Sequence, residues 1–248
     1  MIAAAGDLAV APSPPAPLAG TPRYFALLYT PPAARAGLAT LLALADEISA
    51  GTGRSLDHSV AHARLDWWRA EAARFRGGEP QHPWLRALLP PTGIAPRPEF
   101  APLVDAAAID LATATFGAAA ATAARGAALQ AAVFEQAANV LRGAAGAPPS
   151  LQHALRHLGQ LVGELERLDG QQAATALAAL RMQVAGIDRT QQPQLAPLLV
   201  WVALVAVRAR RRSQRRPGKD SRALDAFADN MVAWNAARRA TRGRFRID

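Results

Sequence analysis

Four carboxylates in this sequence could bind a divalent cation. Asp46 and Glu47 are adjacent, and Asp169 follows Glu166 at a spacing that places both on one helix face. Magnesium takes oxygen ligands from clustered carboxylates and bridges them to the phosphates of a substrate. We therefore treat all four as candidate catalytic residues, Asp46 and Asp169 as candidate metal ligands, and Mg²⁺ as the cofactor if the protein is catalytic. The alternative for Glu166 and Asp169 is a solvated helix face.

Histidines suggest a second kind of metal site. His58, His62 and Asp66 follow one another at intervals of four residues, and His153 and His157 repeat this spacing. Such pairs on a helix can bind zinc or iron. The alternative is that exposed histidines fall at this spacing by chance, and no HExxH motif is present to supply a catalytic base. We expect no metal site here.

The net charge of +9 lies entirely at the C-terminal end, where the last 41 residues carry 13 of the 28 basic side chains and 4 of the 19 acidic ones. A basic helix can bind phosphate, nucleic acid or anionic lipid. Interleaved aromatic residues and nucleic-acid fold signatures are missing, so no specific nucleic-acid partner is expected. A solvated helix end is the alternative. The candidate residues for binding an anionic surface are Arg208, Arg210, Arg211, Arg212, Arg215 and Arg216.

Several classes of protein have no support. The sequence has no GxGxxG, GxxxxGK[ST] or GxSxG motif and no cysteine, which excludes disulfides and thiolate sites. Residues 1–20 are rich in alanine and proline, without the basic start of a signal peptide, and are predicted to be a disordered tail. The most apolar run, Leu195 to Val207, is shorter than the ~20 residues that span a bilayer. We expect a cytoplasmic protein, with peripheral contact at the inner face of the membrane as a further possibility.

The elements that must position these residues are helices. Alanine makes up much of the 51% hydrophobic content, and β-branched residues are sparse, which favours an all-α fold. Apolar spacing, prolines and glycines predict eight or nine helices on one core, forming a single domain over 21–248. The predicted helices cover residues 33–50, 55–76, 84–89, 101–142 with a break near 117–126, 150–169, 171–184, 195–216 and 221–239.

Three segments, read together, resemble the squalene/phytoene synthase family. They are an aromatic opening before a Pro-Pro helix, a Trp-Trp-Arg motif, and a Gly-x-Pro-x-His-Pro segment close behind it. In this sequence they occupy Arg23 to Arg35, Arg64 to Arg69, and Gly78 to Pro83. The run His157 to Gly163 is similar to the branch that includes the mitochondrial complex I assembly factor, and the helix from Leu195 resembles a late helix of the family.

This resemblance implies an isoprenoid (squalene/phytoene) synthase type helical bundle around a ligand cavity. Carried over to matching segments, the cavity residues are Tyr24, Tyr29, Trp68, Gly159 and Gly163. Catalytic members condense two prenyl diphosphates head to head with two DxxxD motifs and Mg²⁺. Here Ala50 occupies the position of the second aspartate of the first motif, and Gly170 occupies the position of the first aspartate of the second motif.

With these acids missing, we expect a non-catalytic protein that binds an isoprenoid or lipid, or acts like an assembly factor, with no cofactor. Its partner would be a membrane surface that it contacts peripherally, or another protein. One alternative is an active Mg-dependent prenyl transferase in isoprenoid biosynthesis. The other is a binder of anionic surfaces through the basic C-terminus.

Overall fold

All regular structure in the described residues is helical, which confirms the predicted all-α fold. The structure, a computed structural model, describes residues 13–52, 57–89, 99–116, 126–168, 170–214 and 222–247. The α-helices are α1 (Pro22–Leu28), α2 (Pro32–Ala50), α3 (His58–Gly77), α4 (Pro83–Ala87), α5 (Ala101–Phe116), α7 (Ala127–Arg142), α8 (Pro149–Leu165), α9 (Gly170–Ala185), α10 (Ala196–Gln214) and α11 (Arg222–Thr241), and a 3-10 turn covers Gly143–Ala145.

Prolines and capping residues set the helix ends. Pro32, Pro83 and Pro149 each open a helix, where the missing N–H costs nothing. Asp57 caps α3 by accepting a hydrogen bond from the Ser59 N–H at 2.8 Å. The prediction that Ser150 caps a helix was wrong, because α8 already begins at Pro149.

The helix α1 was not predicted as an element. Its seven residues are too few for a clear apolar period, and the sequence marks them only as the aromatic opening that carries the family resemblance. The Thr21 side chain caps it by accepting a hydrogen bond from the Tyr24 N–H at 3.2 Å. With α1, the described residues hold ten α-helices, one more than the upper number expected.

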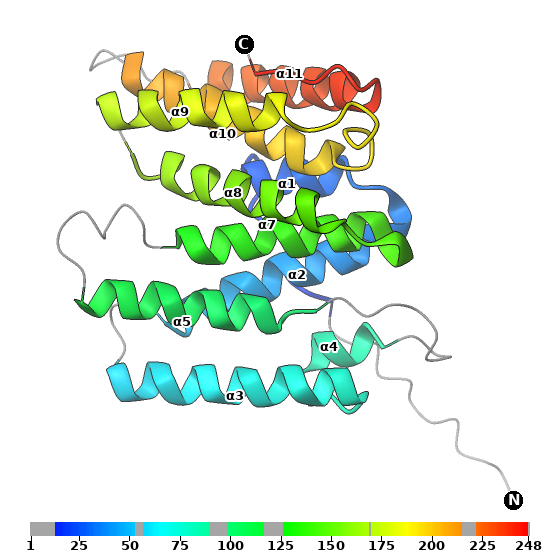
Figure 1. The fold of residues 1–248 in the computed structure, drawn as a ribbon, viewed down its shortest axis with the longest axis vertical. Helices are drawn as coiled ribbons and strands as arrows, with labels where there is room; N and C mark the ends of the chain where they lie inside the picture. The colour runs from blue at the N-terminus through cyan, green and yellow to red at the C-terminus, as the bar shows by residue number, and fades with distance from the viewer. Residues whose placement is uncertain are drawn as a thin grey trace, which may run out of the picture.

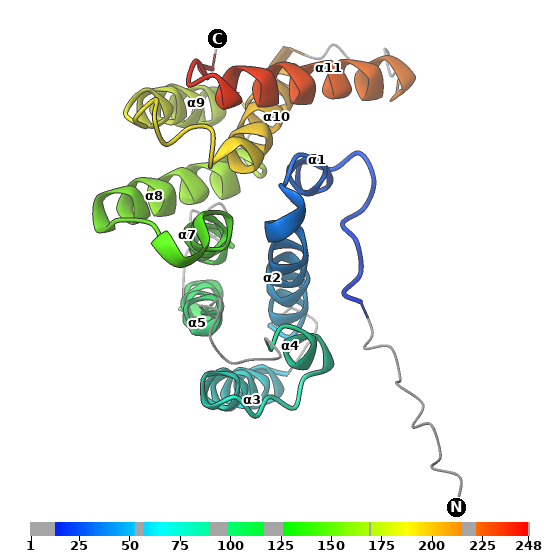
Figure 2. The same ribbon diagram turned by 90° about the vertical axis from the view of Figure 1, so that its right-hand side faces the viewer.

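The helices stack in layers along the long axis of the molecule. Figure 1 shows α3 at one end, followed by α5, α7 and α8, with α9 and α11 at the other end. Figure 2 shows α2 beside α5 and α7, and α1 between α2 and α10. The two most extensive pairings join α7 to α8 and α10 to α11. One hydrophobic core runs through these layers, and Phe134 of α7 and Trp201 of α10 are among its largest fully buried side chains.

No helix in the part of the chain that the structure describes is both long and apolar enough to cross a bilayer.

Candidate functional site

A polar cluster lies where four helices meet at the centre of the fold. Arg23 of α1 forms an ion pair with Asp46 of α2. Its Nη2 also donates to Oε1 of Gln130 on α7 at 3.3 Å. The guanidinium carbon lies 5.4 Å from the centroid of the Trp201 ring on α10. One arginine therefore connects residues more than 100 positions apart, and we call these four residues the central cluster.

Two hydrogen-bond donors in the central cluster have no partner among the described residues. They are Nε2 of Gln130 and Nε1 of Trp201, whose residues are 4% and 1% exposed. An unsatisfied buried donor costs about 1–3 kcal/mol. With the positive charge of Arg23 beside them, these groups suit a ligand that presents oxygen acceptors better than a metal cation.

The acidic candidates do not converge on one point. Asp46 turns to Arg23, whereas Oε2 of Glu47 lies 3.3 Å from Nε2 of His82. Glu166 is exposed at the C-terminal cap of α8, and the structure gives no contact between it and Asp46 or Glu47. Asp169 lies outside the described residues. Within the described ranges, no group of three or more histidine or acidic side chains could hold a metal ion.

The histidine candidates are exposed on helix surfaces. Nε2 of His58 lies 3.0 Å from Nε2 of His62, but Asp66 pairs instead with Arg69 at 2.7 Å. His153 and His157 are exposed on α8. The pair on α3 therefore lacks the third protein ligand that its spacing suggested.

The aromatic cavity candidates are parts of the packed structure. Tyr24 and Tyr29 are partly buried against the core, and burial raises the pKa of the Tyr29 hydroxyl. Trp68 is 4% exposed, with its ring centroid 5.3 Å from that of His82 and 6.2 Å from that of Phe100. In this conformation Trp68 fills space between α3 and its neighbours.

Gly159 and Gly163 face α7. A Cβ atom on Gly159 would lie 2.6 Å from the carbonyl oxygen of Gln130, and one on Gly163 would lie 3.1 Å from the Cβ of Gln130. The two glycines let α8 approach the backbone of α7 closely. They therefore act on the central cluster by fixing the position of Gln130.

A groove between α5, α7 and α8 offers space for an apolar ligand. Its volume is about 530 Å³, and its walls include four alanines of α7 and the exposed Ile109 of α5. Asp110 closes one side, where its carboxylate accepts hydrogen bonds from the N–H groups of Ala128 and Leu129. Burial raises the pKa of Asp110. Glu135 at the other side pairs with Arg156 at 2.7 Å.

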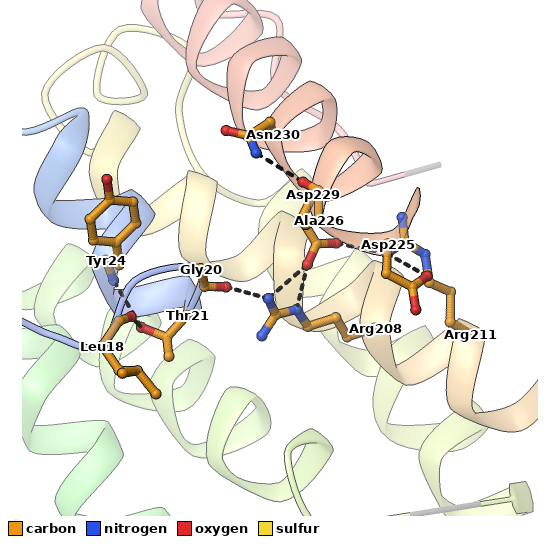
Figure 3. A network of polar contacts seen from close by, with 10 residues as sticks. All are labelled: Leu18, Gly20, Thr21, Tyr24, Arg208, Arg211, Asp225, Ala226, Asp229 and Asn230. Atoms are coloured by element: carbon orange, nitrogen blue, oxygen red, sulfur yellow. Dashed lines mark hydrogen bonds and ion pairs between the residues drawn. The ribbon is translucent and has the colours of Figure 1, made fainter. Parts of the chain in front are cut away.

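The basic candidates of α10 are largely engaged inside the protein. Figure 3 shows Arg208 and Arg211 on either side of Asp229 of α11, each with a contact of 2.7 Å. Arg208 also donates to the carbonyl of Gly20, ahead of α1. Arg212 donates a hydrogen bond to the carbonyl of Leu165. Arg210 also takes part in an interaction within the protein. An external anion would have to compete with these contacts. Arg215 and Arg216 lie outside the described residues.

Sequence reasoning missed three members of the central cluster as a functional group: Arg23, Gln130 and Trp201. Arg23 belongs to the opening segment that carries the family resemblance, and Gln130 and Trp201 lie among the buried residues of α7 and α10. The available signal was the position of Gln130, a polar side chain flanked by the apolar residues Leu129 and Ala131 of α7.

A comparison with protein families gives one match. The model described as squalene/phytoene synthase matches residues 17–163, from just before α1 to near the end of α8. The helical bundle is consistent with the isoprenoid synthase fold of that family. The matched region includes Arg23, Asp46, Gln130 and both glycines of α8. Comparisons with curated proteins and with solved structures find no match.

Proposed function

Because the chain belongs to the squalene/phytoene synthase family, we propose that it is a non-catalytic member that binds an isoprenoid or another apolar ligand. The complex I assembly factor-like branch remains part of this proposal, on the His157 to Gly163 resemblance alone. Fold membership does not fix activity, so the proposal rests on the chemistry of the site.

The observation that carries the proposal is the shortage of carboxylates free to bind a metal around Asp46. Arg23 neutralises this carboxylate, Glu47 turns to His82, and Ala50 ends the helix one turn later without an acid. An exposed ion pair is worth only about 0–1 kcal/mol, so Arg23 alone would not keep Mg²⁺ away. A missing carboxylate cannot be replaced by rearrangement. Magnesium therefore has too few ligands at this end of α2 to hold the phosphates of a substrate.

The groove between α5, α7 and α8 supports the binding part of the proposal. Its volume lies within the range of about 300–1,000 Å³ that is usual for small-molecule sites, and such sites are mostly apolar. An isoprenoid or acyl chain has the matching chemistry.

We predict that the purified protein releases no diphosphate and forms no apolar product from farnesyl or geranylgeranyl diphosphate with Mg²⁺. Circular dichroism would first establish that the sample is helical. Turnover that disappears in Asp46→Asn would overturn the non-catalytic assignment and favour the prenyl transferase alternative.

Binding is tested in the same samples by equilibrium dialysis with geranylgeranyl diphosphate in the absence of Mg²⁺. Ile109→Glu places a charge in the groove and should weaken binding about tenfold, since 1.4 kcal/mol corresponds to a factor of ten. Val60→Glu is the matched control, because Val60 is also exposed but lies on α3. Equal losses in both variants would contradict a site in the groove.

A second candidate function is contact with an anionic membrane surface, and a row of apolar side chains on α11 favours it. Leu224, Phe227, Met231 and Trp234 are 69%, 67%, 44% and 47% exposed at a spacing that gives one helix face. Figure 2 shows α11 as the outer layer at one end of the molecule. The guanidinium of Arg238 lies 5.3 Å from the Trp234 ring. Apolar side chains beside basic ones are typical of helices that lie in a membrane interface.

For this second function we predict co-sedimentation with phosphatidylcholine vesicles only when they contain phosphatidylglycerol. Trp234→Ser should weaken binding tenfold or more, because burying such a side chain is worth about 2 kcal/mol. Trp67→Ser is the control, since Trp67 of α3 is similarly exposed at 42%. Binding that Trp234→Ser leaves unchanged would exclude α11 as the contact surface.

A further inference from the structure

A cavity rich in arginine lies at the C-terminal end of the fold, away from the central cluster. Its volume is about 590 Å³. The end of α9 and the loop before α10 form one side, and the segment that follows α11 forms the other. Figure 2 shows these backbone segments at the same end of the molecule. Arg181, Arg189, Arg244 and Arg246 line it, and none of the described residues that line it is acidic. We call it the arginine cavity.

Specific contacts hold the two sides of the arginine cavity together. Gln192 is 4% exposed, and its Oε1 accepts a hydrogen bond from the Phe245 N–H at 2.8 Å. Its Nε2 donates to the carbonyl of Ile187 at 3.4 Å. Phe245 and Ile187 are buried, with 3% and 4% of their surface exposed. The cavity is therefore built from segments that tertiary structure fixes.

Gly243 permits the two sides of the arginine cavity to approach each other closely. Its φ is +63°, and a Cβ atom there would lie 2.7 Å from the carbonyl oxygen of Arg189. Any other residue would strain the turn and push the two sides apart. The close approach brings Arg189 of the loop to the same cavity as Arg244 and Arg246 of the C-terminal segment.

Among the described residues that line the arginine cavity, no acidic side chain balances its charge. Asp188 belongs to the same loop, but its carboxylate accepts hydrogen bonds from the N–H and hydroxyl of Thr190, which lower its pKa. Asp225 and Asp229 of α11 pair with arginines of α10. Clustered like charges create a positive potential that attracts anions.

The ligand chemistry follows from the side chains. Guanidinium groups present two parallel N–H donors, which match phosphate oxygens, and a concave site strengthens the effect. Arg181 already makes a contact within the protein, so Arg189, Arg244 and Arg246 would meet most of the charge of a ligand. The volume exceeds that of a single phosphate, and the apolar wall formed by Ile187 and Phe245 suits an organic group.

We propose that the arginine cavity binds a multivalent phosphate anion, carried by a soluble organic phosphate or by the headgroup of a phosphate-bearing lipid. This site is separate from the groove and from the apolar row on α11. It does not depend on whether the protein is catalytic.

The test is isothermal titration of the full chain with inorganic pyrophosphate and with inositol hexakisphosphate. We expect binding that weakens with salt, and a loss of at least tenfold in the double variant Arg189→Ala/Arg244→Ala. The double variant Arg64→Ala/Arg86→Ala removes the same charge from exposed positions on α3 and α4 and should retain binding. Thermal melting would check folding, and Arg189→Gln/Arg244→Gln serves if the alanine variant unfolds. Equal losses in both double variants, or no binding by the wild type, would overturn the proposal.

Vesicles distinguish the two sources of phosphate. Binding to phosphatidic acid vesicles that requires Arg189 and Arg244 but survives Trp234→Ser assigns a lipid headgroup. Binding of the soluble anions with no such vesicle binding assigns a soluble phosphate. Vesicle binding that is lost in Trp234→Ser and unaffected by the arginine variants belongs to α11 and would count against a headgroup in the cavity.

Discussion

Replacing Gly159 with alanine should lower the free energy of unfolding by about 2 kcal/mol. The new methyl group would meet the carbonyl oxygen of Gln130 at 2.6 Å and the Cα of Ala131 at 2.9 Å, both backbone atoms that cannot turn away. Forcing extra atoms into a packed core costs up to about 3 kcal/mol, and the better helix propensity of alanine returns about 1 kcal/mol. For a chain of this size the melting temperature should fall by roughly 4–8 °C.

The matched control is Gly77→Ala. Gly77 is also helical, but a Cβ atom there would meet nothing within 4 Å. Its replacement should leave stability unchanged or raise it slightly. Thermal unfolding followed by circular dichroism compares the two variants. If Gly159→Ala melts no lower than Gly77→Ala, then α7 and α8 do not pack as closely as described.

Replacing Glu71 with alanine should cost about 3–5 kcal/mol, the largest effect that we expect from a single polar side chain. Glu71 is 0% exposed, and one carboxylate oxygen accepts the N–H groups of Gln81 and His82, both at 2.7 Å. The other oxygen accepts from Nε of Arg74 at 2.7 Å. Removing the carboxylate leaves three donors without their partner. Urea unfolding would measure the loss.

Two further variants separate charge from shape. Glu71→Gln keeps an acceptor oxygen and should lose about half as much stability as Glu71→Ala, because hydrogen bonds to a charged group are roughly twice as strong as neutral ones. Glu79→Ala changes an exposed acid of the same segment and should fall within about 0.5 kcal/mol of the wild type. A small effect of Glu71→Ala, similar to that of Glu79→Ala, would show that the segment is held by its apolar contacts alone.

Glu71 also gives a physical reason for two motifs to occur together. The Trp-Trp-Arg helix and the Gly-x-Pro-x-His-Pro segment are joined by its hydrogen bonds to Gln81 and His82. Sequence reasoning identified both motifs and missed the residue that connects them, since an acid three positions before an arginine resembles a solvated pair. The signal was position: Glu71 comes three residues after the buried Trp68, on the apolar face of α3.

The helices were predictable because their ends carry local signals, as at Pro32, Pro83 and Gly78. Partners distant in sequence were not. The sequence around Asp46 does not predict its ion pair with Arg23, because that pairing depends on how α1 packs. Gly159 and Gly163 show a different limit: small residues admit either a ligand or a second helix, and only the fold decides between them.

The packing of α1 against α10 has a consequence for how the chain is made. Phe25 and Ala26 of α1 are buried, and α10, the helix that α1 contacts most extensively, begins about 170 residues later. At roughly 5–20 residues per second, a ribosome would need on the order of ten to thirty seconds to reach it. During that interval α1 can pack against α2 but not against α10. The contacts between α1 and α10 can therefore form only after about 170 further residues have been synthesised, and until then the apolar face of α1 that packs on α10 is exposed to other partners.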